Sequence, residues 1–89
     1  MKFFYVYILK SLKDGKFYIG LTADLKRRVS EHQKGKNIST SKRLPVELIY
    51  YEAFLSKKDA QRRERYFKTT KGKTTLRQML REYLVICLD

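Results

Sequence analysis

The sequence has a single cysteine and no long apolar run, and each shortage excludes a class of protein. One cysteine, Cys87, can form neither an internal disulfide nor a cysteine-based zinc site, so we expect a reducing, cytoplasmic setting. A small buried hydrophobic residue is the ordinary role of such a cysteine. No apolar stretch approaches the roughly 18 residues of a membrane-spanning helix, and the N-terminus lacks the layout of a signal peptide. We therefore expect no membrane partner.

Acidic residues are also scarce. Nine Asp and Glu face 21 Lys and Arg, which gives a net charge of +12. A folded chain this basic repels itself, and the commonest reason to carry such charge is to bind a polyanion. The 89 residues suffice for one modest core, and they show no repeat or linker, so we expect a single domain over residues 1–89.

The N-terminal part predicts a β-hairpin. Phe3–Leu9 and Phe17–Leu21 are rich in aromatic and β-branched residues and alternate with the period of a strand. The dipeptide Asp14-Gly15 between them is a turn signal.

The hairpin allows two registers. In one, a two-residue turn pairs Tyr7 with Thr22 and Tyr18 with Ser11; in the other, a longer loop pairs Tyr7 directly with Tyr18. Either register places both tyrosines on the same face of the sheet, because residues that face each other share a side.

A helix is expected directly after the second strand. Thr22 is a good N-cap, Asp24 stands in the first turn, and Gly35 ends the helix. Helical periodicity places Arg28 and His32 on the sheet-facing side. Such a pair is either a polar site or an arginine that extends from the core's edge beside a hydrogen-bonded histidine.

The remaining pattern predicts a loop, a strand and two helices. Lys34–Pro45 is a basic, turn-rich loop, and Val46–Phe54 is a third strand. Ser56 caps a second helix that runs to about Thr70 and stops near Gly72. A third helix begins at a capping box of Thr75 and Gln78 and carries an apolar stripe of Leu76, Met79, Leu80, Tyr83 and Leu84. The order is β-β-α-β-α-α, a small α+β fold with helices packed on a sheet.

Glu64 is the anomaly of the second helix. It falls on the apolar stripe between Ala60 and Phe67. A buried unpaired carboxylate costs several kcal/mol, so Glu64 needs a metal, a pocket or a nearby Arg or Lys as partner.

Two tyrosines, an arginine and a glutamate that converge on a basic sheet suit phosphodiester cleavage. A single carboxylate with waters can hold Mg²⁺, and an arginine can neutralise charge on a phosphate. A phenol near a cation can lose its proton and then accept one from water.

The same residues resemble the GIY-YIG nuclease superfamily, in its group of small single-domain bacterial endonucleases. Tyr5-Val6-Tyr7 stands where the family has its first motif, and Tyr18-Ile19-Gly20 where it has the second. The similarity covers about Tyr5 to Leu80. The helix residues that match the family's positions are Arg28, His32, Glu64 and Lys68.

The chain departs from the family pattern at three places. Tyr5 replaces the first motif's glycine, Leu21 stands where excision-repair relatives carry a lysine, and the third helix has no asparagine where some relatives place one.

The resemblance implies a three-stranded antiparallel sheet flanked by helices and metal-dependent hydrolysis of a DNA backbone. By that analogy either Tyr7 or Tyr18 is the general base or positions the water. Arg28 would contact the scissile phosphate, and Glu64 would bind Mg²⁺ or Mn²⁺. His32 and Lys68 would assist.

The expected partner is DNA, structured or branched, in repair or recombination. We expect no second module within these 89 residues, so specificity would come from basic segments, a homodimer or a targeting protein. The side chains expected to bind nucleic acid are Arg28, Lys42, Arg43, Lys68, Lys71 and Lys73.

Two other readings compete with a nuclease. One is a basic nucleic-acid-binding module with weak or no catalysis, in which exposed aromatic residues would stack on bases. The other is a basic structural protein associated with RNA or ribosomes. The aromatic candidates, which could equally belong to the core, are Tyr50, Tyr51, Tyr66 and Phe67.

Overall fold

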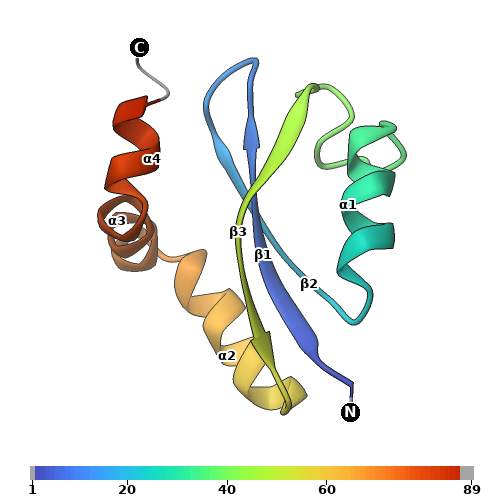
Figure 1. Ribbon diagram of the computed structural model, residues 1–89, viewed down its shortest axis with the longest axis vertical. Coiled ribbons are helices and arrows are strands. Elements are labelled where there is room, and N and C mark those ends of the chain that lie inside the picture. Colours follow the sequence, from blue (N-terminus) through green and yellow to red (C-terminus); the bar gives the residue numbers. More distant parts are fainter. Residues whose placement is uncertain (1, 87–89) are drawn as a thin grey trace.

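The computed structural model describes residues 2–86, so the expectation for Cys87 lies outside the described part. The three strands form an antiparallel sheet in the order β2-β1-β3, with helices on both faces (Figure 1). This confirms the α+β fold, with one helix more than the sequence indicated. The elements are β1 (Phe4–Ser11), β2 (Phe17–Thr22), α1 (Leu25–Gln33), β3 (Val46–Phe54), α2 (Lys57–Phe67), α3 (Thr70–Met79) and α4 (Arg81–Ile86).

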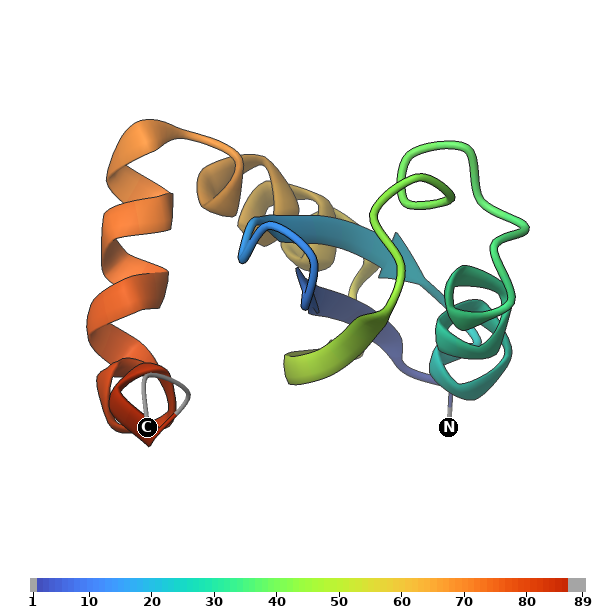
Figure 2. The same cartoon turned by 90° about the horizontal axis from the view of Figure 1, so that it is seen from above.

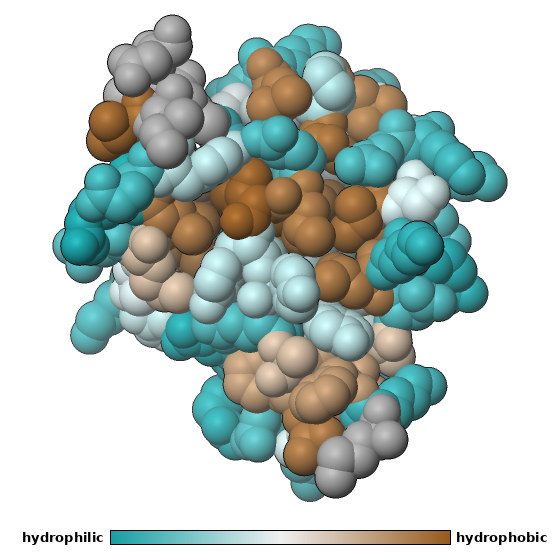
Figure 3. All heavy atoms as spheres, in the orientation of Figure 1, coloured by the Kyte–Doolittle hydropathy of each residue, from teal (hydrophilic) through white to brown (hydrophobic). Residues whose placement is uncertain are grey.

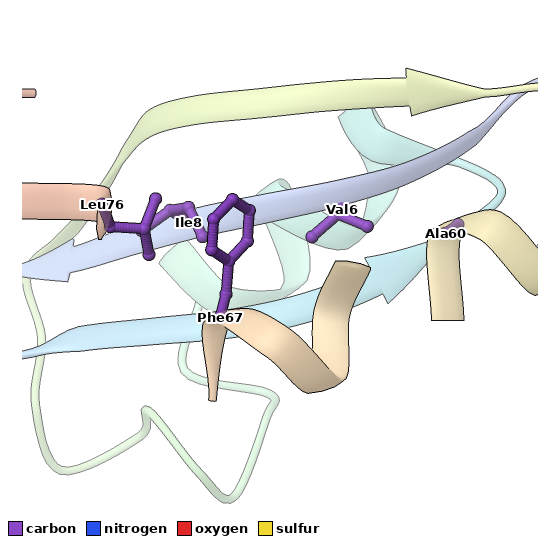
Figure 4. Packing of buried hydrophobic residues seen from close by; sticks show 5 residues of the cluster. All are labelled: Val6, Ile8, Ala60, Phe67 and Leu76. Atoms are coloured by element: carbon purple, nitrogen blue, oxygen red, sulfur yellow. The ribbon is translucent and has the colours of Figure 1, made fainter. Parts of the chain in front are cut away.

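The central strand β1 supplies both halves of the core. On one face Val6 and Ile8 pack against Ala60 and Phe67 of α2 and Leu76 of α3, and all five side chains are fully buried (Figure 4). This packing attaches α2 and α3 to the sheet. It confirms the alternation predicted for β1 and the apolar face predicted for α2.

The opposite face of β1 carries Tyr7 and Leu9. Both are buried, and they pack with Leu25 and Val29 of α1. Tyr7, a candidate catalytic residue, thus lies on the α1 side of the sheet. The cluster around Val6, Ile8 and Phe67 lies on the α2 side.

Both predicted hairpin registers are wrong, and the observed register lies midway between them. Tyr7 pairs with Gly20, and Leu9 pairs with Tyr18. The loop closes where the backbone N–H of Ser11 donates to the carbonyl of Lys16, at 2.9 Å. The Ser11 hydroxyl accepts hydrogen bonds from the backbone N–H groups of Lys13 and Asp14, and Gly15 has φ +74. The loop therefore consists of the four residues 12–15. The tyrosines still share a face, as predicted.

The N-cap of α1 is Asp24 and not Thr22. Thr22 still pairs with Tyr5 in the sheet, and its hydroxyl accepts the N–H of Asp24 at 3.0 Å. The Asp24 carboxylate accepts the N–H of Arg27 at 3.2 Å, which satisfies a free donor of the first turn. The end of the helix agrees with the prediction, since Gly35 follows it with φ +76.

Gly72 does not end α2 but lies within α3. The helix α2 ends at Phe67, and Thr69 caps α3 by accepting the N–H of Gly72 at 3.0 Å. A Cβ on Gly72 would lie 1.8 Å from the carbonyl oxygen of Tyr66. The glycine is therefore required by the close approach of the two helices and not by a turn.

The predicted third helix is two helices. The capping box at Thr75 does not form, because α3 already begins at Thr70, and the Thr75 hydroxyl lies 2.6 Å from the hydroxyl of Tyr66. The helix α3 ends at Met79 with Leu80 as its C-cap, and α4 begins at Arg81, so the apolar stripe is interrupted. Met79, one of its members, is 41 % exposed.

Candidate active site

Edge strand β2 forms the floor of a polar pocket of about 470 Å³. The pocket does not lie over one face of the sheet. Figure 2 shows α1 and the loop after it on one side of β2, and α2 and α3 on the other. Its chemistry-bearing lining residues are Tyr7, Tyr18, Arg28, His32, Asn37, Ser39, Glu64, Lys68 and Lys73.

Tyr7 reaches this edge from the central strand by crossing Gly20. A Cβ on Gly20 would lie 2.3 Å from both Cζ and the hydroxyl oxygen of Tyr7. Any side chain at this position would displace the phenol. The glycine therefore opens the path along which a buried tyrosine presents its hydroxyl to the pocket.

The Tyr7 hydroxyl belongs to a short chain of hydrogen bonds. It lies 3.0 Å from Nε2 of His32, and Nδ1 of His32 lies 2.8 Å from the hydroxyl of Thr40. All three side chains are buried, with 3 %, 4 % and 0 % of their surface exposed. The chain thus ties the central strand, α1 and the loop after α1 together.

Burial sets the protonation states of this chain. Burial raises the pKa of Tyr7, and a hydrogen bond and the positive charge of Arg28 partly oppose the rise. Burial also lowers the pKa of His32, and the charge of Arg28 lowers it further. At neutral pH Tyr7 is therefore a phenol and His32 is neutral, which lets the imidazole accept a proton.

Arg28 faces Tyr7 from α1. Their mutual hydrogen bond is the largest cause of the raised pKa of Arg28. Arg28 also pairs with Glu31, one turn later, with an Nη1 to Oε1 distance of 3.5 Å. The neighbouring Arg27 is exposed, and the half-buried Tyr18 lines the same pocket as Arg28.

Glu64 enters the pocket from α2, on the other side of β2. Its side chain is 21 % exposed, and Oε2 lies 3.3 Å from Nζ of Lys68. The predicted anomaly is therefore resolved by a pocket and by a lysine partner together. Its charge acts on the Tyr7 hydroxyl across the edge of the sheet.

The structure separates the basic residues that the sequence grouped as nucleic-acid-binding. Lys68 and Lys73 line the pocket, as does Arg28, but Lys42, Arg43 and Lys71 do not. Arg43 instead pairs with Asp14 of the hairpin loop at 3.2 Å. Here the basic loop is held against the hairpin.

The sequence pattern missed Thr40 and Gly20 as members of the site. Nothing in a threonine within a polar loop signals that it will be buried against a histidine. Gly20 did carry a signal, because a glycine inside a strand marks a close approach of another group. Asn37 and Ser39 were included only as part of the basic loop.

A larger hollow lies elsewhere and has a different character. It has a volume of about 700 Å³ and lies between α1 and β3. Leu48 and the rings of Tyr5 and Tyr51 line it together with polar side chains, among them Asp24 and Lys26. The face in Figure 3 shows apolar side chains gathered between α1 and the helices on the opposite side. Among the described residues, the charged ones that line this larger hollow are Asp24 and Lys26, and neither an arginine nor a histidine lines it, so size alone does not mark the site.

Comparison with known proteins decides the family. Residues 3–78 match the model of the GIY-YIG catalytic domain. The chain belongs to the GIY-YIG family. Its nuclease domain places the chain among hydrolases of nucleic acids, with DNA as the substrate that the family suggests.

Relatives of this GIY-YIG chain include UPF0213 proteins of several bacteria. One from Streptococcus pneumoniae is 46 % identical over 75 % of this chain and 68 % of its own length. One from Lacticaseibacillus paracasei is 47 % identical over 75 % of both chains. The solution NMR structure of a UPF0213 protein from Bacillus halodurans is 39 % identical, covers 89 % of this chain and 85 % of its own, and superposes with a TM-score of 0.55.

The described residues contain neither a cluster of metal-ligating side chains nor a helix that could span a membrane. Within residues 2–86, no three His, Cys, Asp or Glu side chains cluster as a ready-made metal site. Among those residues, the acidic side chain that lines the pocket is Glu64. None of the helices in that range has the length and apolar character needed to cross a bilayer.

Proposed function

We propose that this GIY-YIG protein is a metal-dependent endonuclease that hydrolyses phosphodiester bonds of DNA. The observation that carries the proposal is the meeting of Tyr7, Arg28 and Glu64 in one pocket. They come from three different elements and from both sides of β2. A base, a fixed cation and a carboxylate are the parts that phosphodiester hydrolysis needs.

Arg28 binds and orients the scissile phosphate in this proposal. Its guanidinium has donors only, and one of them is used by the phenol of Tyr7. Its ion pair with Glu31 is long and half-exposed, so it leaves the remaining donors available to an anion. A phosphate held there lies beside the Tyr7 hydroxyl.

Tyr7 and His32 move the proton. Arg28 donates to the Tyr7 oxygen, so the phenol can donate its own proton to Nε2 of His32. The imidazole N–H at Nδ1 then donates to the hydroxyl of Thr40. When the attacking water loses a proton to Tyr7, Tyr7 passes its own proton to His32, and the phenol is never a free phenolate.

Glu64 fits a divalent cation. One carboxylate oxygen is held by Lys68, the side chain is partly exposed, and it opens into the pocket. Mg²⁺ is commonly bound through one or two carboxylates with waters and substrate phosphate oxygens, so a single glutamate suffices. When bound, Mg²⁺ or Mn²⁺ would neutralise charge on the phosphate and favour ionisation of water.

The DNA backbone would leave the pocket along α3. Lys73 and Phe17 line both the pocket and a neighbouring hollow that also contains Lys16 and Arg77. The guanidinium of Arg77 lies 4.9 Å from the centroid of the Phe17 ring, which orients it. These cations would bind the phosphates next to the one that is cleaved.

The test compares Glu64→Gln with Glu82→Gln. Glu82 is an exposed glutamate of α4 that pairs with its neighbour Arg81 and does not line the pocket. Supercoiled plasmid and a branched DNA, a substrate of the kind formed in repair and recombination, are incubated with Mg²⁺, Mn²⁺ or chelator. We expect cleavage that requires the metal, is lost in Glu64→Gln and is retained in Glu82→Gln.

A second readout is independent of cleavage. Mn²⁺ binding followed by electron paramagnetic resonance should weaken at least tenfold in Glu64→Gln, while DNA binding changes little. Cleavage that persists in Glu64→Gln would remove the metal-ligand role. Binding of DNA without cleavage under any condition would instead favour a nucleic-acid-binding module.

A further inference from the structure

Ile38 is an apolar residue whose surface is almost entirely exposed to solvent. It is 95 % exposed, whereas the other exposed large apolar side chains of the described residues are between 39 % and 57 % exposed. A single exposed isoleucine is ordinary on a protein surface. Its position distinguishes this one.

Ile38 stands at the rim of the active-site pocket. Its neighbours on both sides, Asn37 and Ser39, line that pocket. Ile38 is therefore carried by the same turn whose two neighbouring residues line the pocket.

Hydrogen bonds hold this turn in place. The side-chain oxygen of Asn37 accepts from the backbone N–H of Ser39 at 3.0 Å and from its hydroxyl at 2.6 Å. The N–H of Thr40 donates to the carbonyl of Asn37 at 3.2 Å, and the buried Thr40 side chain is bonded to His32. The turn that presents Ile38 is thus anchored to the hydrogen-bond chain of Tyr7.

The charges around Ile38 identify what it would contact. Arg28, Lys68 and Lys73 line the pocket beneath it, and Lys34 and Lys36 precede it on the same loop. A rim this cationic suits a polyanion and not an apolar peptide. The largest apolar surface of a duplex is the flat face of its bases, which is reached where two bases separate, and isoleucine is one of the side chains that proteins insert at such steps.

We propose that Ile38 inserts between two stacked bases of duplex DNA, at the step beside the phosphodiester bound in the pocket. This inference rests on the proposed function and names its substrate class. Separating two bases is least costly at mismatched or damaged positions and at flexible pyrimidine–purine steps. The protein would therefore prefer DNA whose stacking is already weak at the cleavage position.

The test uses Ile38→Ser, Ile38→Met and Leu55→Ser. Methionine keeps a long apolar side chain at the rim, and Leu55 is an exposed leucine, 56 % exposed, that does not line the pocket. Each variant is offered a fully paired duplex and the same duplex with one mismatch. The fluorescence of 2-aminopurine, placed at successive positions of the strand, reports unstacking.

We expect wild type, Ile38→Met and Leu55→Ser to raise the fluorescence at one step of the paired duplex, and Ile38→Ser not to. Ile38→Ser should lower kcat/KM about tenfold on the paired duplex and less than about twofold on the mismatched one. We call the inserted Ile38 side chain the wedge. A fluorescence rise that Ile38→Ser retains, or an equal loss of kcat/KM on both duplexes, would refute the insertion of this wedge.

The wedge and the nuclease can fail separately. The fluorescence arm is repeated in the Glu64→Gln background, where no cleavage is needed. A fluorescence rise that depends on Ile38, with no cleavage of any substrate by the wild type, would support base insertion and reject the nuclease. Cleavage by a wild type that unstacks no base would reject the wedge and leave the nuclease standing.

Discussion

Gly20→Ala should displace the ring of Tyr7 while the rest of the fold is retained. The added Cβ would lie 2.3 Å from the Tyr7 hydroxyl and Cζ, whereas ordinary contacts between carbon atoms are about 3.5–4 Å. The ring must therefore retreat by more than about 1 Å. Because Tyr7 is buried and bonded to His32 at 3.0 Å, that shift breaks the hydrogen bond.

The magnitude follows from three effects. Strain from an extra methyl in a packed site costs about 1–3 kcal/mol, and the lost hydrogen bond about 0.5–1.5 kcal/mol. The lower entropy of the unfolded alanine chain offsets about 0.4–1 kcal/mol of this. We expect the free energy of unfolding to fall by about 2 kcal/mol and Tm by about 10 °C. Cleavage should fall about 100-fold, since a displacement of about 1 Å in a catalytic group can cost that much.

The assay is a double-mutant cycle followed by urea and thermal unfolding. Tyr7→Leu removes the ring atoms that the new Cβ would meet but fills much of their volume. In that background Gly20→Ala should cost far less, with a coupling of at least about 1 kcal/mol. Strict additivity of Gly20→Ala and Tyr7→Leu would refute the reasoning, as would full cleavage by Gly20→Ala alone.

Three further predictions concern other parts of the molecule. The pKa of His32, the only histidine of the sequence, should lie below its ordinary value in an NMR titration and should rise in Arg28→Gln. Because the folded state disfavours the protonated imidazole, the contribution of His32 to the free energy of unfolding should be full above about pH 6.5 and should fall as the pH drops below it. Gly72→Ala should lower the unfolding free energy by at least about 3 kcal/mol, since its Cβ would meet the Tyr66 carbonyl at 1.8 Å, and an unchanged denaturant midpoint would contradict this. Lys73→Ala should reduce the slope of log affinity against log salt by about one unit in DNA-binding titrations, and an unaltered slope would place the DNA elsewhere.

Periodicity predicted most of the fold because the buried faces follow it. The alternation along β1 and the spacing of Ala60 and Phe67 in α2 correspond to fully buried side chains. Caps were less predictable. Thr22 and Asp24 are both good N-cap residues, and only the extension of β2 through Thr22 decides between them.

The roles of some glycines could be predicted from the sequence, and those of others could not. Gly35 ends a helix by its own backbone preference, so its role is local and readable. Gly72 and Gly20 are required by groups brought close in the fold, the carbonyl of Tyr66 and the phenol of Tyr7. Such requirements depend on tertiary contacts that no local pattern contains.

The site could be predicted as a set of residues but not as an arrangement. Helix periodicity correctly placed Arg28 and His32 on the sheet side and Glu64 on the apolar stripe. It could not show that they meet across the edge of β2, because that depends on the strand order. The bond to Thr40 depends on how the loop folds back.

The edge position of β2 limits how this protein can associate through its sheet. Exposed strand edges invite pairing with another chain, and proteins commonly protect them with charged side chains. Here Arg28, Glu64 and Lys68 meet across the free edge of β2, so a further strand added there would displace them and close the pocket. Any extension of the sheet by a partner or a second copy is therefore confined to β3, on the opposite edge.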